Sequence, residues 1–100
     1  MLKTVVLEKE NNKKERPQIY LKALPLRDRE EVDDIKKNLS SNVIVILRIT
    51  PLAQKNIEEL RKAVEELYNY TTAIGGDIAR LGEERIVVTP PGVKIWRGLL

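Results

Sequence analysis

The sequence predicts an α+β fold, a two-layer α/β sandwich in which two helices cover one face of a mixed sheet. Apolar residues recur at strand spacing and at helix spacing in turn, in the order β-α-β-α-β-β-β. Residues 43–49 are almost continuously apolar, which is typical of a central strand covered on both faces. A glycine-containing turn at 82–84 separates two apolar runs, as in an antiparallel hairpin.

The first 16 residues are expected to form an arm and a linker ahead of a core domain at 17–97. Residues 1–8 are an apolar run in which four side chains would share one face of a helix: Met1, Leu2, Val5 and Val6. Lys9 falls on that same face, and the β-branched residues favour a strand, so a loose arm or edge strand is the preferred interpretation. A remnant of a membrane-targeting segment is the alternative. Residues 9–16 are polar and read as a linker.

The sequence of the first half of the core domain predicts a strand, a helix and a buried strand. Alternating apolar residues define the first strand, which Pro25 ends: Ile19, Leu21 and Ala23. Asp28 and Glu31 resemble a capping box at the start of a helix over roughly 28–39. The strand at 43–49 then has one face for the helices. Its other face needs a partner, which we expect to be the sheet or the helices of a second copy.

A long helix is the element around which the second half is organised. Thr50 is expected to cap it, Pro51 suits its first turn, and Gly75-Gly76 ends it. Its apolar stripe is Ile57, Leu60, Val64, Leu67, Thr71 and Ile74. Such a helix would be roughly 36 Å long at ~1.5 Å per residue, which again favours burial against a second subunit.

The chain is expected to end in a hairpin and one further strand. Runs at 77–81 and 85–89 flank the turn, and Pro90-Pro91-Gly92 breaks the second of them. Val93, Ile95 and Trp96 would then make a short last strand.

Composition restricts the function more than it defines it. The 100 residues allow one domain, and the absence of Cys and His removes disulfides, thiolate metal sites and the commonest general base. We therefore expect no enzyme activity, no cofactor and no metal. The 18 basic and 15 acidic residues are nearly balanced, as in heat-adapted proteins, and the chain shows no membrane span or signal peptide, which favours the cytoplasm.

Three blocks of sequence resemble the SepF family of cell-division proteins. The most specific is Thr-Ala-Ile-Gly-Gly-Asp-Ile-Ala-Arg-Leu-Gly at 72–82, followed by Val-Val-Thr-Pro-Pro-Gly-Val at 87–93. The run at 43–47 lies where the family has a Val-Val-Val-Asn-Leu strand. The resemblance covers about residues 20–96, and the archaeal branch of the family fits the heat-adapted composition.

The resemblance implies a non-enzymatic adaptor that binds the C-terminal tail of FtsZ, forms homodimers and polymers, and links the division ring to the membrane. In the family, the tail lies in a groove formed by the long helix and the final hairpin. Arg80 matches the family's basic position in the third strand, and Ile86 matches an apolar position in the fourth, where Val88 shares its face. The chain departs from the family at Asn69, where many relatives have glycine, at Thr72 in place of tyrosine, and in an N-terminus without a clear amphipathic helix.

Each expected site has a plainer alternative. Arg80 would pair with an acidic group of the tail, but it could equally be a solvated charge on an exposed face. The end of the long helix supplies the residues expected in self-association: Leu67, Tyr68, Tyr70, Ile74, Gly75 and Gly76. Two other functions stay open, a small enzyme and a nucleic-acid-binding domain that would use Lys22, Arg48, Arg80 and Arg85.

Overall fold

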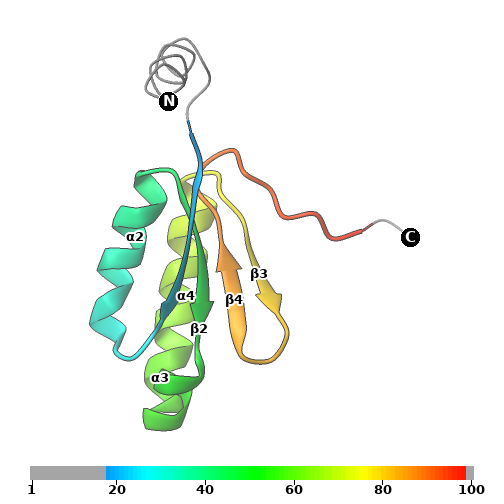
Figure 1. The fold of residues 1–100 in the computed structure, drawn as a ribbon. Coiled ribbons are helices and arrows are strands. Elements are labelled where there is room, and N and C mark those ends of the chain that lie inside the picture. Colours follow the sequence, from blue (N-terminus) through cyan, green and yellow to red (C-terminus); the bar gives the residue numbers. More distant parts are fainter. Residues whose placement is uncertain (1–17, 99–100) are drawn as a thin grey trace, which may run out of the picture.

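The computed structural model describes residues 18–98, which form a mixed sheet with helices against it (Figure 1). The expected membrane residues Met1, Leu2, Val5 and Val6 and the linker at 9–16 lie outside this described part. The elements in chain order are β1 (Tyr20–Pro25), the 3₁₀ turn η1 (Arg29–Glu31), α2 (Val32–Ser40), β2 (Val43–Arg48), α3 (Thr50–Lys55), α4 (Ile57–Ala73), β3 (Ile78–Leu81) and β4 (Arg85–Val88).

The sheet has four strands in the order β1-β2-β4-β3. β1 and β2 are parallel, and α2 makes the crossover between them. β2 and β4 are antiparallel, as are β3 and β4, which form the expected hairpin around the 82–84 turn. The prediction of an α+β sandwich with a mixed sheet is therefore confirmed.

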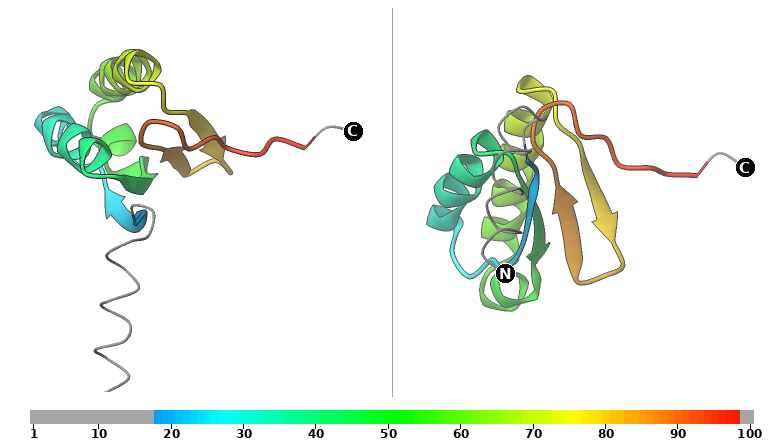
Figure 2. Two further views of the ribbon diagram at one scale, coloured as in Figure 1. Left: turned by 90° about the horizontal axis from the view of Figure 1, so that it is seen from above. Right: turned by 45° about the horizontal axis from the view of Figure 1, so that its top comes forward.

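The helices cover one face of the sheet only, as Figure 2 shows in the view from above. Alternate residues of β2 and β4 point to this face and are buried: Val43, Val45, Leu47, Ile86 and Val88. They pack with the apolar faces of α2 and α4, which contribute Val32, Ile35, Leu39, Leu60, Ala63 and Leu67. None of the helices within residues 18–98 is both long and apolar enough to span a membrane.

The other face of the sheet is apolar apart from Arg48 and Arg85 at one end, and it is not covered by any element of the described chain. The pairing register places Leu21, Ala23, Ile44, Ile46, Ala79 and Val87 on it. Leu21 is 63% exposed, whereas Ile44 and Ile46 are half-buried by their neighbours in the sheet. We call this surface the open face; it is the face of β2 for which the sequence predicted a partner.

The expectation of one unbroken helix from Thr50 to Ile74 is wrong. Asn56 adopts an extended conformation, separates α3 from α4, and accepts hydrogen bonds on its side-chain oxygen from the backbone N–H groups of Glu58 and Glu59, at 3.1 Å each. Asn56 is thus the N-cap of a second helix. Thr50 is not a cap either, because it lies inside α3 with Ile49 at the N-cap.

The break also changes the exposure of Ile57, which the helical stripe predicted to be a core residue. Ile57 is the first residue of α4 and is 55% exposed. Leu60 and Leu67, later in the same stripe, are buried as predicted. The stripe therefore begins only one turn into α4.

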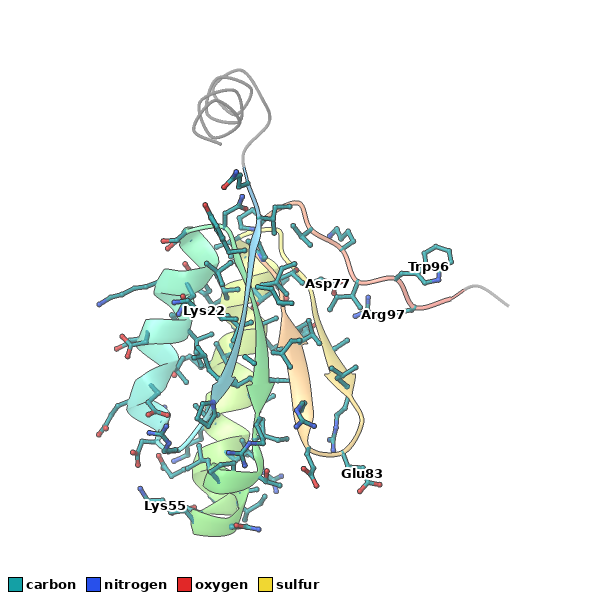
Figure 3. The ribbon with its side chains drawn as sticks, in the orientation of Figure 1. Lys22, Lys55, Asp77, Glu83, Trp96 and Arg97 are labelled. Carbon is teal, nitrogen blue, oxygen red and sulfur yellow. The ribbon has the colours of Figure 1, made fainter. Side chains whose placement is uncertain are left out.

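The expected last strand does not form within the described residues. The backbone N–H of Ile95 donates to Asp77 Oδ2 at 2.9 Å, so this segment is held by a side chain and not by a strand ladder. Trp96 lies beyond this contact and is 79% exposed (Figure 3).

Gly75-Gly76 ends α4 as predicted, but the two glycines serve different purposes. Gly75 has a φ of +81°, the left-handed conformation that suits glycine after a helix. Gly76 is needed for space, since a Cβ at this position would overlap the carbonyl oxygen of Thr89. The Gly-Gly pair thus turns the chain sharply and brings β3 alongside the residues that follow β4.

Candidate functional site

A groove runs between α4 and the β3–β4 hairpin, on the helix-covered side of the sheet. Its volume is about 300 Å³, and its lining is mostly apolar: Ile49, Ile57, Leu60, Arg61, Val64, Arg80 and Ile86. The groove exists because β3 is the edge strand on this side and no described helix extends over it.

The floor of the groove is made by residues that also belong to the core. Ile49, Leu60 and Ile86 are 7%, 8% and 5% exposed, so each presents a small apolar area to the groove. Ile57 rises above this floor at the start of α4, where the break at Asn56 leaves it exposed. The groove therefore combines a rigid apolar floor with one exposed aliphatic side chain.

Arg80 forms the wall of the groove on the hairpin side. It pairs with Ile86 across the β3–β4 ladder and so points to the same face. Its Nε donates to the carbonyl oxygen of Gly82 at 3.2 Å, and one terminal nitrogen donates to that of Glu83 at 3.0 Å. These two bonds hold the guanidinium over the hairpin turn, at the end of the molecule where Figure 3 labels Glu83.

The structure brings together two of the three residues that were expected to contact a peptide. Arg80 and Ile86 line the groove, but Val88 does not, because it is fully buried in the core two residues further along β4. Sequence reasoning missed Arg61 and Ile57. A cation among several on a helix surface gives no signal of its own until the hairpin is placed beside it.

The residues expected in self-association are only partly accessible. Tyr68 is 55% exposed, and Tyr70 is half-buried with Lys36 Nζ 5.3 Å from its ring centre. Leu67 is fully buried in the core and cannot contact a second copy directly, and Gly76 is half-buried against the backbone of Thr89. Ile74 is half-buried and Gly75 is exposed.

Asp77 organises the segment that follows the Gly-Gly pair. Its carboxylate accepts two hydrogen bonds from the Arg97 guanidinium, at 2.9 and 3.1 Å, and one each from the N–H groups of Ile78 and Ile95. These donors, led by Arg97, lower the pKa of Asp77 well below its usual range. Thr89 completes this hydrogen-bond network, which we call the joint. Its hydroxyl accepts from the N–H of Asp77 at 2.7 Å and donates to the carbonyl of Val93 at 2.6 Å.

This network shows what the Gly-Gly-Asp block does in the fold. The block ties the end of α4, the start of β3 and the segment after β4 to one another, and Figure 3 shows Asp77 and Arg97 side by side where the C-terminal segment leaves the sheet. The glycines end a helix and do not precede one, so they do not form a phosphate cradle.

The basic residues of the nucleic-acid alternative do not share one surface. Arg48 and Arg85 are directly opposite each other on the open face. Lys22 and Arg80 lie on the helix side, at the two opposite edges of the sheet. Because nucleic-acid binding relies on cations gathered along one face, this division removes the main argument for that function.

The described residues thus form a small α+β domain with two distinct surface features, an apolar groove edged by Arg80 and an uncovered sheet face. Residues 18–98 hold no cluster of three or more acidic side chains placed to bind a metal ion. The chain belongs to the SepF family, since the family model described as Cell division protein SepF matches residues 22–95. This is a family of cell-division adaptors and not a family of enzymes.

Solved structures of family members are similar in fold. A SepF-like protein from Archaeoglobus fulgidus is 26% identical, with a TM-score of 0.75 over 82% of this chain and 98% of that one. A SepF-like protein from Pyrococcus furiosus is 28% identical, with a TM-score of 0.72 over 82% and 99%.

A third structure is the cell division protein SepF from Methanobrevibacter smithii in complex with FtsZ-CTD. It is 17% identical, with a TM-score of 0.70 over 79% of this chain and 99% of that one, and at this identity the likeness concerns the fold. A search of curated proteins found no match.

Proposed function

We propose that this protein is an adaptor that binds the C-terminal tail of FtsZ in the groove between α4 and the β3–β4 hairpin. The observation that supports the proposal most strongly is the groove itself, which has an apolar floor that includes Ile86 and a wall formed by Arg80, whose guanidinium is fixed by hydrogen bonds to the hairpin turn. The Methanobrevibacter smithii relative, which has this fold, was solved with FtsZ-CTD.

Binding would combine apolar burial with one ion pair. An aliphatic or aromatic side chain of the tail fits against Ile49, Leu60 and Ile86, while a carboxylate of the tail pairs with Arg80. The hydrogen bonds to Gly82 and Glu83 fix the guanidinium in advance, so less side-chain entropy is lost on binding.

A groove of about 300 Å³ holds only a short peptide segment, so affinity per site should be modest. FtsZ filaments present one tail per subunit, and a dimer could hold two tails at once. Avidity would then exceed the affinity of a single site by a factor on the order of 10² or more. The adaptor would thus attach firmly to a filament and weakly to a single FtsZ subunit.

Self-association is assigned to the open face. Its apolar residues are continuous across all four strands, and contiguous exposed apolar surface of this kind marks an interaction site. A second copy would cover it sheet against sheet, leaving the helices and the grooves outward. Tyr68 and the neighbouring end of α4 would then be free for contacts between dimers.

A link to the membrane would run through residues 1–16, for which the sequence favours a loose arm and offers a membrane-targeting remnant as the alternative. In that alternative the apolar side chains of Met1, Leu2, Val5 and Val6 would insert at the lipid surface at the division site, with the polar stretch at 9–16 as the tether. Together with the groove, this arrangement would connect the FtsZ ring to the inner surface of the membrane.

The test is the affinity of the FtsZ C-terminal peptide from the same organism, measured by calorimetry. Arg80→Glu should weaken binding at least about tenfold, because it replaces an attraction by a repulsion. Arg80 is a cleaner probe than Ile86, whose truncation would cost about 2–5 kcal/mol of stability in the core. Lys22→Glu is the matched control, since it makes the same charge change at the far edge of the same side of the sheet.

Two outcomes would count against the proposal in different ways. Equal affinities of wild type and Arg80→Glu would reject the groove as the binding site. Full-length FtsZ that is retained equally well with and without its last residues in a pull-down would reject the tail as the ligand.

A further inference from the structure

The groove has a cation on each of its two walls. Arg80 comes from β3 and Arg61 from α4, and the residues between them are apolar: Ile49, Leu60, Val64 and Ile86. The two arginines are far apart in the sequence and come together only because the hairpin packs beside the first half of α4. Nothing in the helical pattern distinguishes Arg61 from its charged neighbours.

Arg61 is available for a ligand. Its side chain is 69% exposed, and its ion pair within residues 18–98 is a contact of 3.7 Å with Glu58. Glu58 is itself 66% exposed and one turn away on the same helix. Exposed pairs of this kind contribute little, so a carboxylate with better geometry can replace Glu58 at small cost.

Arg80 is equally without an acidic partner in the described chain, although its position is fixed. Both of its hydrogen bonds go to backbone carbonyl groups, which leave the positive charge of the guanidinium uncompensated. The groove therefore presents one positive charge without an acidic partner in the described chain, Arg80, and one that is only loosely paired, Arg61, on either side of an apolar strip. A ligand that matches it has the complementary pattern.

We propose that Arg61 is a second specificity-determining residue of the groove, and that the peptide bound there has carboxylates on both sides of an apolar side chain. Arg61 pairs with one carboxylate, Arg80 pairs with the other, and the apolar side chain lies on the floor between them. This inference rests on the proposed function and states which chemistry of the FtsZ tail the groove recognises.

The pattern also requires the bound segment to span the groove. Its two carboxylates must reach α4 and β3 respectively, because each arginine lies on a different wall. Arginine suits both positions, since its guanidinium can bind a carboxylate through two parallel hydrogen bonds and lysine cannot. Arg61→Lys should accordingly keep only part of the affinity.

The experiment is a double-mutant cycle between the protein and the FtsZ C-terminal peptide, measured by calorimetry on the full chain. Arg61→Gln should weaken binding by up to about fivefold, as expected for one exposed ion pair. Lys62→Gln, the next residue on α4, is the matched control and should change affinity less than about twofold. The same measurements are made with peptides in which single acidic residues are replaced by the corresponding amides.

The cycle identifies the pairing directly. One amide peptide should bind wild type and Arg61→Gln equally well while remaining sensitive to Arg80→Gln, and a different amide peptide should show the reverse. Affinity losses that are the same for Arg61→Gln and Lys62→Gln would overturn the inference while leaving the proposed function intact. Failure of the wild-type chain to bind the unmodified peptide would overturn the proposed function and this inference with it.

Discussion

At the scale of single residues, the hydrogen-bond network of Asp77 connects three segments of the chain. Its carboxylate accepts from Arg97 and from the backbone of Ile78 and Ile95, while its own N–H donates to Thr89. The side chain of Asp77 is only 18% exposed, so these bonds are poorly replaced by water. Asp77 is therefore a structural residue that fixes the start of β3, and through β3 the position of Arg80 in the groove.

Asp77→Asn should lower the melting temperature at neutral pH by about 4 °C or more. The folded-state pKa of Asp77 is depressed, so its stabilising contribution is complete above the unfolded pKa of roughly 4 and is lost as the pH falls toward the folded value. The difference in unfolding free energy between wild type and variant should consequently shrink below about pH 4. Urea unfolding of both proteins at several pH values measures this difference in unfolding free energy.

Asp33→Asn is the control for this experiment. Asp33 is exposed in the first turn of α2 and takes part in none of the ion pairs found in residues 18–98. A gap between wild type and Asp77→Asn that stays constant from neutral pH to pH 3 would show that the carboxylate charge is not what stabilises the joint.

At the scale of elements, the break between α3 and α4 shapes the groove. A continuous helix would turn Ile57 with the apolar stripe toward the core, whereas the restart at Asn56 leaves Ile57 exposed at the groove. The side chain of Asn56 stabilises the restart by accepting from two N–H groups that would otherwise lack partners. One capping residue thus decides the form of the binding surface.

Asn56→Ala should destabilise the protein by about 1 kcal/mol, the usual cost of losing an N-cap. Asn69→Ala on the exposed face of the same helix is the matched control. It should be neutral or stabilising by a few tenths of a kcal/mol, because alanine has the higher helix propensity. Denaturant unfolding of both variants gives the comparison.

A rise in stability and helix content for Asn56→Ala would contradict this account of the break. It would indicate that α3 and α4 join into one helix when the cap is removed, as the sequence pattern alone suggested.

At the scale of the whole molecule, the two faces of the sheet have different tasks. The helix side contains the core and, at its edge, the groove. The open face is apolar but uncovered, and Leu21 at 63% exposure is its most accessible aliphatic residue. A single copy therefore leaves apolar surface that a second copy can bury.

We expect a homodimer of twice 11.5 kDa in dilute solution, and Leu21→Glu should convert it to a monomer. A carboxylate on the open face would have to be buried without a partner in the dimer. Lys22→Glu, on the neighbouring residue of β1 but on the other side of the sheet, should leave the dimer intact. Light scattering coupled to size exclusion measures the masses.

The outcome for Tyr68→Glu locates the interface. A monomer from Tyr68→Glu, together with a dimer from Leu21→Glu, would place the interface at the end of α4 and reject the assignment to the open face. A wild-type monomer would reject the homodimer altogether.

The sequence predicted the sheet better than it predicted the helices and the last strand. The strands at 43–48 and 85–88 were found because short runs of apolar, β-branched residues give a clear signal, and the glycine turn indicated the hairpin. The break was missed although Asn56 is followed three residues later by Glu59, a recognisable N-terminal pattern. The prediction of a last strand was wrong because Ile95 and Arg97 form hydrogen bonds to the side chain of Asp77 instead of pairing with a strand. Such long-range bonds cannot be recognised in the local sequence.

The candidate site was predictable only in part. Resemblance to the family indicated Arg80 and Ile86, and the structure places both in the groove. Val88 was included because it shares a face of β4 with Ile86. Sharing a face does not show whether a residue reaches the groove or is buried entirely in the core. Arg61 could not be found without the packing of the hairpin against α4.

The most direct test of the account is a map of the FtsZ C-terminal peptide on the protein by NMR. Titration should shift the amide and methyl signals of Ile57, Val64, Arg80 and Ile86, and should leave those of Leu21 and Ile44 on the open face unchanged. Shifts confined to the open face or to the end of α4, or no shifts at all at saturating peptide, would contradict the claim that this groove binds the tail.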